Sequence, residues 1–475
     1  MTRPASYLGI DLGTSGLKVA LLREDGHLVA EGEAAYQVLA PRTGWAETDP
    51  AVWWSALGRV VEGMSDALRA HELEGIGLAG QMHGVVLCDR AGTPSRPAIL
   101  WPDRRSQQHL TRWHELSAAD RARLSNPIVP GMFGPILSWL AENEPSVVAR
   151  AAVALLPKDV VRVGLTGDPC TDRSDASATL LWDVTDDGWA RDIAARTGVP
   201  DRLLPPVVAS DQVAGVTSWL AKTVGGGGPD DVPVVAGGGD TPVAMLAAGS
   251  EGPHINLGTG AQVLMAGVEP HSRAAPDTHL YGDTEGGWYA MAAVQNAGLA
   301  LDWVMNVLGL SWADLVTVLA APAPRQGVSF LPFLTGERGA LAQPDSRAAW
   351  LGLDQATTRD DLARAAVEAM VFTVRRAVEL LPAVPASTAG PVCLTGGGGR
   401  EPALQQLLAD VLGREVQRVE VRSSSATGAA VLAARGTGGA LVPQRRQGPV
   451  VSPRRAVALG EAYERWLSRV PVADA

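Results

Sequence analysis

Two aspartates stand at the ends of apolar, strand-like segments, beside glycine-rich turns where a carboxylate can meet a ligand. The first, Asp11, follows the apolar segment 7–10 and precedes the turn 12–16, which holds two glycines and two hydroxyl side chains. Glycines let a backbone approach a phosphate closely, so that successive N–H groups can point at it. A carboxylate at a strand end can also hold a hydrated Mg²⁺ ion, which prefers oxygen ligands. The segment is neither a Walker A motif nor a GxGxxG fingerprint, and a glycine-rich hairpin that binds nothing is the alternative.

The second aspartate, Asp240, follows three glycines at the end of the apolar segment 232–236. Glycines on one side of an acid leave space for a substrate beside its carboxylate. The alternative is a structural role in which Asp240 caps the following helix. The two roles can coexist, because a helix N-terminus favours negative charge.

Two further glycine-bracketed segments are candidates for ligand contact. Gln81, Met82 and His83 lie between glycines after the apolar segment 75–79, and polar residues at a strand end are well placed to meet a ligand. A lone histidine is more often structural, so His83 carries that alternative as well. The segment 396–399 consists of four glycines between a strand pattern and a helix pattern, which lets a nucleotide lie on the backbone.

Apolar periodicity and turn residues predict the elements that position these candidates. A hairpin is expected over 17–22 and 27–32, and a helix over 50–70 with Asp49 as its N-cap and Pro50 in its first turn. The other expected strands are 75–79, 85–89, 98–101, 232–236, 288–293 and 392–395, and the other expected helices are 295–307 and 401–412. The glycine-flanked candidates therefore fall at strand ends or helix starts.

The opening segment has an echo in the second half of the chain. Residues 254–263 repeat its pattern of an apolar run, Leu-Gly-Thr and a second apolar run. Two such turns, far apart in sequence, predict two related halves that clasp one polyphosphate.

The sequence D-L-G-T-S-G at 11–16, with L-G-T-G at 257–260, resembles the superfamily of sugar kinases, Hsp70 and actin. Further blocks, in matching order over nearly the whole chain, resemble the carbohydrate kinase branch called the FGGY family. This resemblance implies an α/β fold of two RNase H-like domains with an ATP cleft between them. It implies a first domain over 1–245 with the sugar site and the catalytic base, and a second over 246–475 with the nucleotide site.

The resemblance also implies roles for single residues. Asp240 is expected to be the general base that accepts the hydroxyl proton as the acceptor oxygen attacks the γ-phosphorus of ATP, and Asp11 is expected to organise Mg²⁺. The residues expected to bind the sugar are Gln81, Met82, His83, Asp103 and Thr241. The residues expected to bind the nucleotide are Gly13, Thr14, Ser15, Lys18, Gly258, Thr259, Gly397, Gly398 and Gly399. ATP and Mg²⁺ are the implied cofactors, and a small sugar is the implied partner.

Within the family, the blocks 81–83 and 99–105 are most similar to the branch that acts on D-xylulose. The implied reaction is phosphorylation of the terminal C5 hydroxyl by ATP, which gives D-xylulose 5-phosphate. Pro102, Ile136 and Pro242 stand where the family usually has asparagine, lysine and a small residue. These departures support another ketose or polyol as an alternative acceptor, such as ribulose, glycerol or sedoheptulose. A non-catalytic ATP-binding switch like Hsp70 or actin is the further alternative, and retention of the aspartate base argues against it.

Three other segments have structural interpretations. Lys158, in a block shared with the acidic segment 172–175, is expected beneath the cleft rather than in it. Glu337 and Arg338 are expected either to form an ion pair at the cleft or to contact the ligand directly. The small residues 425–430 enter a helix and are expected to allow close helix packing.

Composition restricts the class of protein. A chain of 475 residues is too long for one core, so two or more domains are expected. The net charge, 40 − 51 = −11, argues against a nucleic-acid partner. Cys88, Cys170 and Cys393 lack metal-site spacing and indicate reduced thiols in a cytoplasmic protein. No leader-like N-terminus or membrane-spanning apolar run is seen, so no membrane partner is expected. A homodimer is kept as an open alternative to a monomer.

Overall fold

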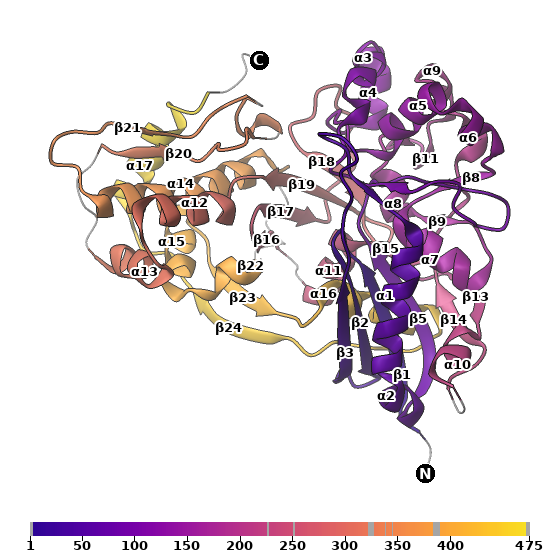
Figure 1. Ribbon diagram of the computed structural model, residues 1–475. Coiled ribbons are helices and arrows are strands. Elements are labelled where there is room, and N and C mark those ends of the chain that lie inside the picture. Colours follow the sequence, from indigo (N-terminus) through magenta and orange to yellow (C-terminus); the bar gives the residue numbers. More distant parts are fainter. Residues whose placement is uncertain are drawn as a thin grey trace.

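Two mixed β-sheets, one in each half of the chain, form the framework on which the candidate residues lie (Figure 1). The structure is a computed structural model, and it describes residues 3–225, 228–249, 252–321, 327–337, 339–343, 345–382 and 390–471. Helices pack against both sheets. The α/β class and the two-domain organisation expected from the sequence are therefore confirmed.

Both aspartates lie at the carboxyl ends of parallel strands in the first sheet. Its strands, in spatial order, are β13 (Val213–Thr217), β14 (Val232–Val235), β5 (Glu72–Gly80), β1 (Ala5–Leu12), β2 (Gly16–Arg23) and β3 (Leu28–Ala35), with β15 (Gly238–Gly239) also paired to β5. Strands β1 and β2 form a hairpin in which Asp11 is paired with Lys18, while β5 runs parallel to β1. The predicted strand–turn–strand at the start of the chain is correct.

The second sheet repeats the central arrangement of the first. Its strands, in spatial order, are β18 (His279–Gly282), β19 (Trp288–Val294), β17 (Ala261–Ala266), β16 (His254–Leu257), β22 (Val392–Thr395), β23 (Val416–Glu420) and β24 (Arg446–Val451). Strands β16 and β17 form a hairpin, and β22 runs parallel to β16 as β5 runs parallel to β1. The repeated Leu-Gly-Thr segment thus marks the same position, a hairpin turn, in two related halves.

Helices cover the sheets. Those used below are α1 (Pro50–Gly63), α2 (Ser65–Ala70), α11 (Asp240–Ala248), α12 (Gly298–Leu308), α13 (Trp312–Ala320), α14 (Arg359–Leu380) and α15 (Pro402–Leu412). Asp49 caps α1 as expected, because its carboxylate accepts a hydrogen bond from Ala51 N at 2.9 Å. The single helix predicted over 50–70 is wrong: it breaks at Met64, between a glycine and a serine that both favour helix ends.

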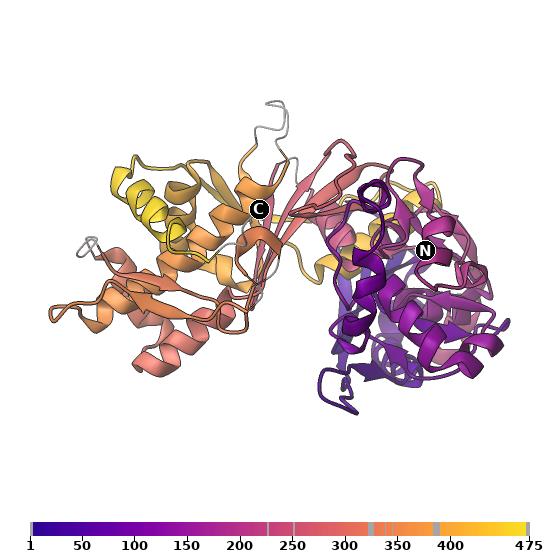
Figure 2. The same cartoon turned by 90° about the horizontal axis from the view of Figure 1, so that it is seen from above.

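A long insertion between β5 and β14 carries several sugar-side candidates. Its elements include β6 (Val86–Cys88), β7 (Ala98–Ile99), α3 (Leu110–His114), α4 (Ala118–Leu124), α5 (Phe133–Asn143), α6 (Pro145–Arg150), β8 (Val153–Leu155), α7 (Pro157–Thr166), α8 (Arg173–Ser177), α9 (Arg191–Arg196) and α10 (Trp219–Val224). Its apolar core includes Met82 and also Tyr281 and Tyr289, which come from β18 and β19. The second sheet therefore reaches the first half of the chain, and Figure 2 shows its strands between the two halves.

One helix of the second half lies on the first sheet. Helix α16 (Ser424–Gly436) packs against β1, β2 and β5. A Cβ on Gly9 would lie 1.7 Å from the carbonyl oxygen of Ala426, and one on Gly77 would lie 1.9 Å from that of Ala429. The close packing expected for the small residues of this helix is confirmed. The boundary near residue 245 stays a prediction, since α16 follows it in sequence yet packs on the earlier sheet.

Within the described residues, no single helix is long and apolar enough to cross a membrane. Helices α12 and α13 reach the required length and composition only when taken together, across a bend of 97°.

The contact between α16 and the first sheet predicts a large effect of one methyl group. Gly77→Ala should lower the thermal unfolding temperature, because overpacking of this kind costs about 1–3 kcal/mol or more. The matched control is Gly58→Ala in α1, where an added Cβ has no atom within 4 Å. That change should leave stability unchanged or slightly higher, because alanine is the better helix former. Equal unfolding temperatures for the two variants would contradict the close approach.

Candidate active site

Asp11 and Asp240 both lie where the parallel strands β1, β5 and β15 of the first sheet end. Asp11 is the next-to-last residue of β1, and Asp240 opens α11 directly after β15. Strands β1 and β15 flank β5, on which Leu12 and Gly239 are both paired with Gly80. Two strand spacings, about 10 Å, therefore separate the backbones that carry the two carboxylates. That distance leaves room for a reacting group between them.

Burial makes both carboxylates hold their protons more tightly than usual. The pKa of Asp11 is raised to about 7 by burial and by the nearby charge of Asp240, while the ammonium of Lys18 opposes the shift. Burial raises the pKa of Asp240 to about 6, against hydrogen bonds from the Thr241 hydroxyl and backbone. A carboxylate that ionises close to neutral pH is well matched to taking up a proton from a hydroxyl group.

The first turn is held in place by side chains from three other segments. The Tyr36 hydroxyl donates to Gly13 O at 2.5 Å, and Gln81 Nε2 donates to the same oxygen at 3.2 Å. Trp101 Nε1 donates to Thr14 Oγ1 at 2.9 Å. The predicted phosphate turn of Gly13, Thr14 and Ser15 is thus a fixed loop beside Asp11, and its contact with phosphate stays a prediction.

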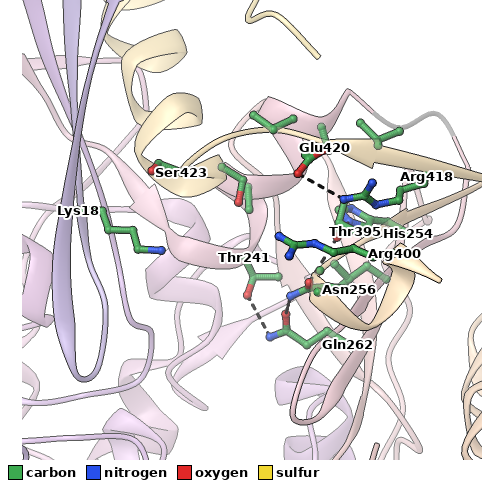
Figure 3. Close-up of a pocket in the computed structure, with 18 residues that line it drawn as sticks. Lys18, Thr241, His254, Asn256, Gln262, Thr395, Arg400, Arg418, Glu420 and Ser423 are labelled. Carbon is green, nitrogen blue, oxygen red and sulfur yellow. Dashed lines mark hydrogen bonds and ion pairs between the residues drawn. The ribbon is translucent and has the colours of Figure 1, made fainter. Parts of the chain in front are cut away.

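A cavity of about 360 Å³ opens between the two halves, next to Asp240. Lys18, Thr241 and Gly397 line it, so the structure brings these three predicted residues together. In Figure 3 the Lys18 side chain points across the cavity toward residues of the second sheet. The lining residues that the sequence did not single out include His254, Asn256, Gln262, Thr395, Arg400, Arg418, Glu420 and Ser423. Their signal in the sequence was weak: several directly flank the second Leu-Gly-Thr turn or the glycine loop.

Other predicted nucleotide residues lie beside the cavity rather than in its lining. Gly258 O and Thr259 O accept hydrogen bonds from the first two amides of α12, at 3.1 and 2.8 Å. Of the glycine loop, Gly398 packs against Leu257, and Gly399 is buried with its carbonyl accepting a hydrogen bond from Gln405. Nucleotide binding by these residues stays a prediction, and backbone support is what the structure gives them.

The sugar-side residues 81–83 lie next to the strand end that leads to Asp240. Met82 is buried, and a Cβ on Gly239 would touch its side chain at 2.9 Å. His83 has a left-handed backbone with φ of 72°, and its Nδ1 lies 2.7 Å from Ala178 O. The ring of Tyr281, from the second half, lies 5.8 Å from the ring of His83. His83 is therefore oriented by both halves of the chain.

Asp103 is held inside a buried cluster of charges. One carboxylate oxygen accepts from Ala46 N at 2.6 Å, and both oxygens accept from Arg105. Arg105 also pairs with Glu47 and stacks over the ring of Trp45 at 3.6 Å. Asp103 is 1% exposed, so the structure gives it a structural task, and a sugar contact stays a prediction.

A second buried charge cluster supports the strand end that leads to Asp240. Lys158 is fully buried and pairs with Asp159, Asp172 and Asp175 at 2.6, 3.0 and 3.2 Å. Those carboxylates raise the pKa of Lys158, so it stays charged. From the same cluster, Ser174 Oγ accepts a hydrogen bond from the amide before Asp240 at 3.0 Å. The structural interpretation of Lys158 agrees with this position.

The departures from the family pattern have simple local explanations. Pro242 lies in the first turn of α11, where its missing N–H removes no helix hydrogen bond. Ile136 is fully buried in α5, and Pro102 is exposed.

Glu337 accepts hydrogen bonds from the amides of 295–296, whereas Arg338 lies outside the described residues.

The surroundings of Asp11 fit a hydrated magnesium ion. Asp11 Oδ1 is buried, and no hydrogen-bond partner for it occurs among the residues that the structure describes. No group of three or more His, Cys, Asp or Glu side chains in that part of the chain could hold a metal by itself. Mg²⁺ is usually bound by one or two carboxylates together with water and substrate phosphates, and Asp11 supplies that kind of donor.

Comparisons with known proteins agree with this geometry. The models of the FGGY family of carbohydrate kinases match residues 6–247 with the N-terminal domain and 254–437 with the C-terminal domain. The xylulose kinase of Escherichia coli K12 is 31% identical over 438 residues, which cover 90% of this chain and 89% of that protein. The crystal structure of a xyloylose kinase from Brucella ovis is 30% identical, with a TM-score of 0.89 and 98% of each chain covered. A gluconate kinase structure from Lactobacillus acidophilus has a TM-score of 0.88 at 20% identity and covers 98% of this chain and 97% of that one, a likeness of fold alone.

The raised pKa of Asp240 predicts a stability gain on removing its charge. Between about pH 4 and 6 the folded protein binds more protons at this site than the unfolded chain, so stability falls as pH rises through that window. Asp240→Asn should therefore unfold at a higher temperature than wild type at pH 8 without ligands. The gain should shrink at pH 5. The exposed Asp302→Asn is the control, and a lower unfolding temperature for Asp240→Asn at pH 8 would contradict the prediction.

Proposed function

Because this chain belongs to the FGGY family of carbohydrate kinases, we propose that it transfers the γ-phosphoryl group of ATP to the terminal C5 hydroxyl of D-xylulose. The observation that carries the proposal is the placement of Asp240, at a glycine-opened strand end beside Asp11 and the cavity. The family and its dependence on ATP follow from the matched domains. The choice of acceptor is supported by the relatives at about 30% identity, which are named as kinases of xylulose.

In the proposed reaction Asp240 acts as general base. The acceptor hydroxyl gives its proton to the Asp240 carboxylate as its oxygen forms a bond to the γ-phosphorus, and the bond from that phosphorus to the β-phosphate oxygen breaks. ADP and D-xylulose 5-phosphate result. Asp11 would hold Mg²⁺, which when bound offsets the charge of the phosphates. Lys18 would meet a phosphate from across the cavity.

Sugar recognition is proposed for the segment that lies beside Asp240. His83 is oriented by Ala178 O and the Tyr281 ring, so its imidazole has a fixed direction from which to meet a substrate hydroxyl. Gln81 contributes a buried Oε1 with no partner among the described residues. Buried polar groups that match a substrate's hydroxyls reject analogues that leave those groups unpaired.

A different ketose or polyol is the second candidate acceptor. The observation that favours it is Ile136, which stands where the family usually has a lysine and is fully buried in α5. The likeness in fold to a gluconate kinase shows that the fold alone does not fix the acceptor. A non-catalytic ATP-binding switch is less well supported, because such a protein has no need of a carboxylate placed as Asp240 is.

Asp240→Asn should lower phosphoryl transfer by roughly 10²–10⁴-fold, the usual contribution of a general base. ATP binding, measured by calorimetry, should stay close to wild type. In wild type, kcat/KM should fall as pH decreases through about 6, since the base must be ionised to act. Turnover of Asp240→Asn within a few-fold of wild type would remove Asp240 from this role.

The acceptor is tested with a substrate panel of D-xylulose, D-ribulose, L-ribulose, L-xylulose, glycerol, sedoheptulose and gluconate. D-xylulose should have the highest kcat/KM in wild type. His83→Ala should raise the KM for D-xylulose while ATP affinity without sugar changes little. A higher kcat/KM for another acceptor would overturn the xylulose assignment and leave the family assignment intact. If His83→Ala leaves the KM and kcat/KM unchanged for every acceptor, the histidine is structural.

A further inference from the structure

A row of hydrogen bonds begins at a buried histidine in the second sheet. His254 Nε2 lies 2.7 Å from Thr395 Oγ1, and the Thr395 hydroxyl donates to Asn256 Oδ1 at 3.4 Å. Asn256 Nδ2 then donates to Gln262 Oε1 at 3.3 Å, across the paired strands β16 and β17. Figure 3 shows these side chains along one wall of the cavity.

The same row continues across to the first half of the chain. Gln262 Nε2 donates to Thr241 Oγ1 at 3.4 Å, and the Thr241 hydroxyl donates to Asp240 Oδ1 at 3.1 Å. Gln262 belongs to β17 and Thr241 to α11, so this link joins the two halves at the first residue after Asp240.

Each hydrogen bond in the row points in the same direction, toward Asp240. The Thr395 hydroxyl gives its proton to Asn256, so it must accept one from His254 Nε2. Burial lowers the pKa of His254 to about 4, which keeps the imidazole neutral at pH 7. The hydrogen bond to Thr395 then assigns the imidazole proton to Nε2. Hydrogen bonds aligned head to tail polarise one another, and this row ends on a carboxylate oxygen. Its arrangement therefore favours negative charge at Asp240.

We propose that Gln262 is a positioning residue for phosphoryl transfer, which holds the Thr241 hydroxyl on Asp240 Oδ1 and so leaves Oδ2 directed at the acceptor. The inference rests on the proposed function, because it takes Asp240 to be the base. Without Gln262, the Thr241 hydroxyl loses the donor that fixes its rotation, and the carboxylate loses its fixed partner. Thr395, the second member of the row, is the residue before Gly396 at the cavity, so the row joins the glycine loop to the base.

The test removes the amide and keeps the shape. Gln262→Met has similar length and can make neither hydrogen bond. The matched control is Gln417→Met on β23, whose amide donates to Gly448 O at 3.1 Å and touches no member of the row. Gln262→Met should lower kcat and the single-turnover rate roughly tenfold, the factor that corresponds to one ordinary hydrogen bond. KM for acceptor and for ATP should stay within about twofold, as expected for an interaction that matters in the transition state.

Further variants separate positioning from a general structural effect. Combining Gln262→Met with Thr241→Val should cost no more than Thr241→Val alone, because both act through one hydroxyl. Gln262→Glu should be slower than Gln262→Met, since it lacks the donor and brings a second carboxylate. If thermal unfolding shows that Gln262→Met does not fold, Gln262→Glu is measured in its place. A wild-type single-turnover rate in Gln262→Met, or additive losses in the double variant, would overturn the inference.

Failure of the proposed function gives a different pattern. If Asp240→Asn keeps its activity, Asp240 is not the base, and the inference about Gln262 fails whatever rate Gln262→Met shows. A wild type that prefers another acceptor overturns the xylulose assignment alone, and the Gln262 series is then measured with that acceptor.

Discussion

Gly80 is the residue on which the geometry of the site depends. It ends β5 between Leu12 and Gly239, so the alignment of three strands meets at its backbone. A Cβ at this position would lie 2.8 Å from the Cβ of Lys158, so the residue at the centre of the buried charge cluster packs directly against the strand end. Because the strand ends are fixed in this way, two carboxylates that repel each other and that burial tends to protonate are held on either side of β5.

The electrostatics of the site follow from that arrangement. Asp11 and Asp240 are brought together in surroundings that favour their protonated forms, with Lys18 as a nearby cation. Such a site is unfavourable for the folded protein without ligands and favourable once cationic and hydroxyl partners arrive. The hydrogen bond that the Thr241 hydroxyl donates to Asp240 offsets part of this cost, and Gln262 of the second sheet donates to that hydroxyl. The burial of the two carboxylates therefore both favours ligand binding and lowers the stability of the folded protein without ligands.

Much of the framework could be predicted from local sequence, and most of the contacts could not. The two Leu-Gly-Thr hairpins, the Asp49 cap and the strand before Asp240 are set by short-range pattern, which the sequence displays directly. Asp103 accepts a hydrogen bond from the amide of Ala46, and its partner Arg105 pairs with Glu47, and no local sequence pattern indicates pairings at that separation. The polar wall of the cavity was missed for the same reason, because it is assembled from strands more than a hundred residues apart. The break at Met64 was missed because apolar periodicity continues through it.

The position of α16 has a consequence for how the chain is made. Tyr7, Leu22 and Ala79 belong to an apolar cluster of the first sheet that this helix completes with its own small residues. During synthesis the early part of a chain generally folds first. Here the first sheet must wait with that face uncovered until residue 436 has left the ribosome, near the end of translation. The first half therefore reaches its final form late, and a nascent chain that stalls before α16 presents an apolar surface to chaperones.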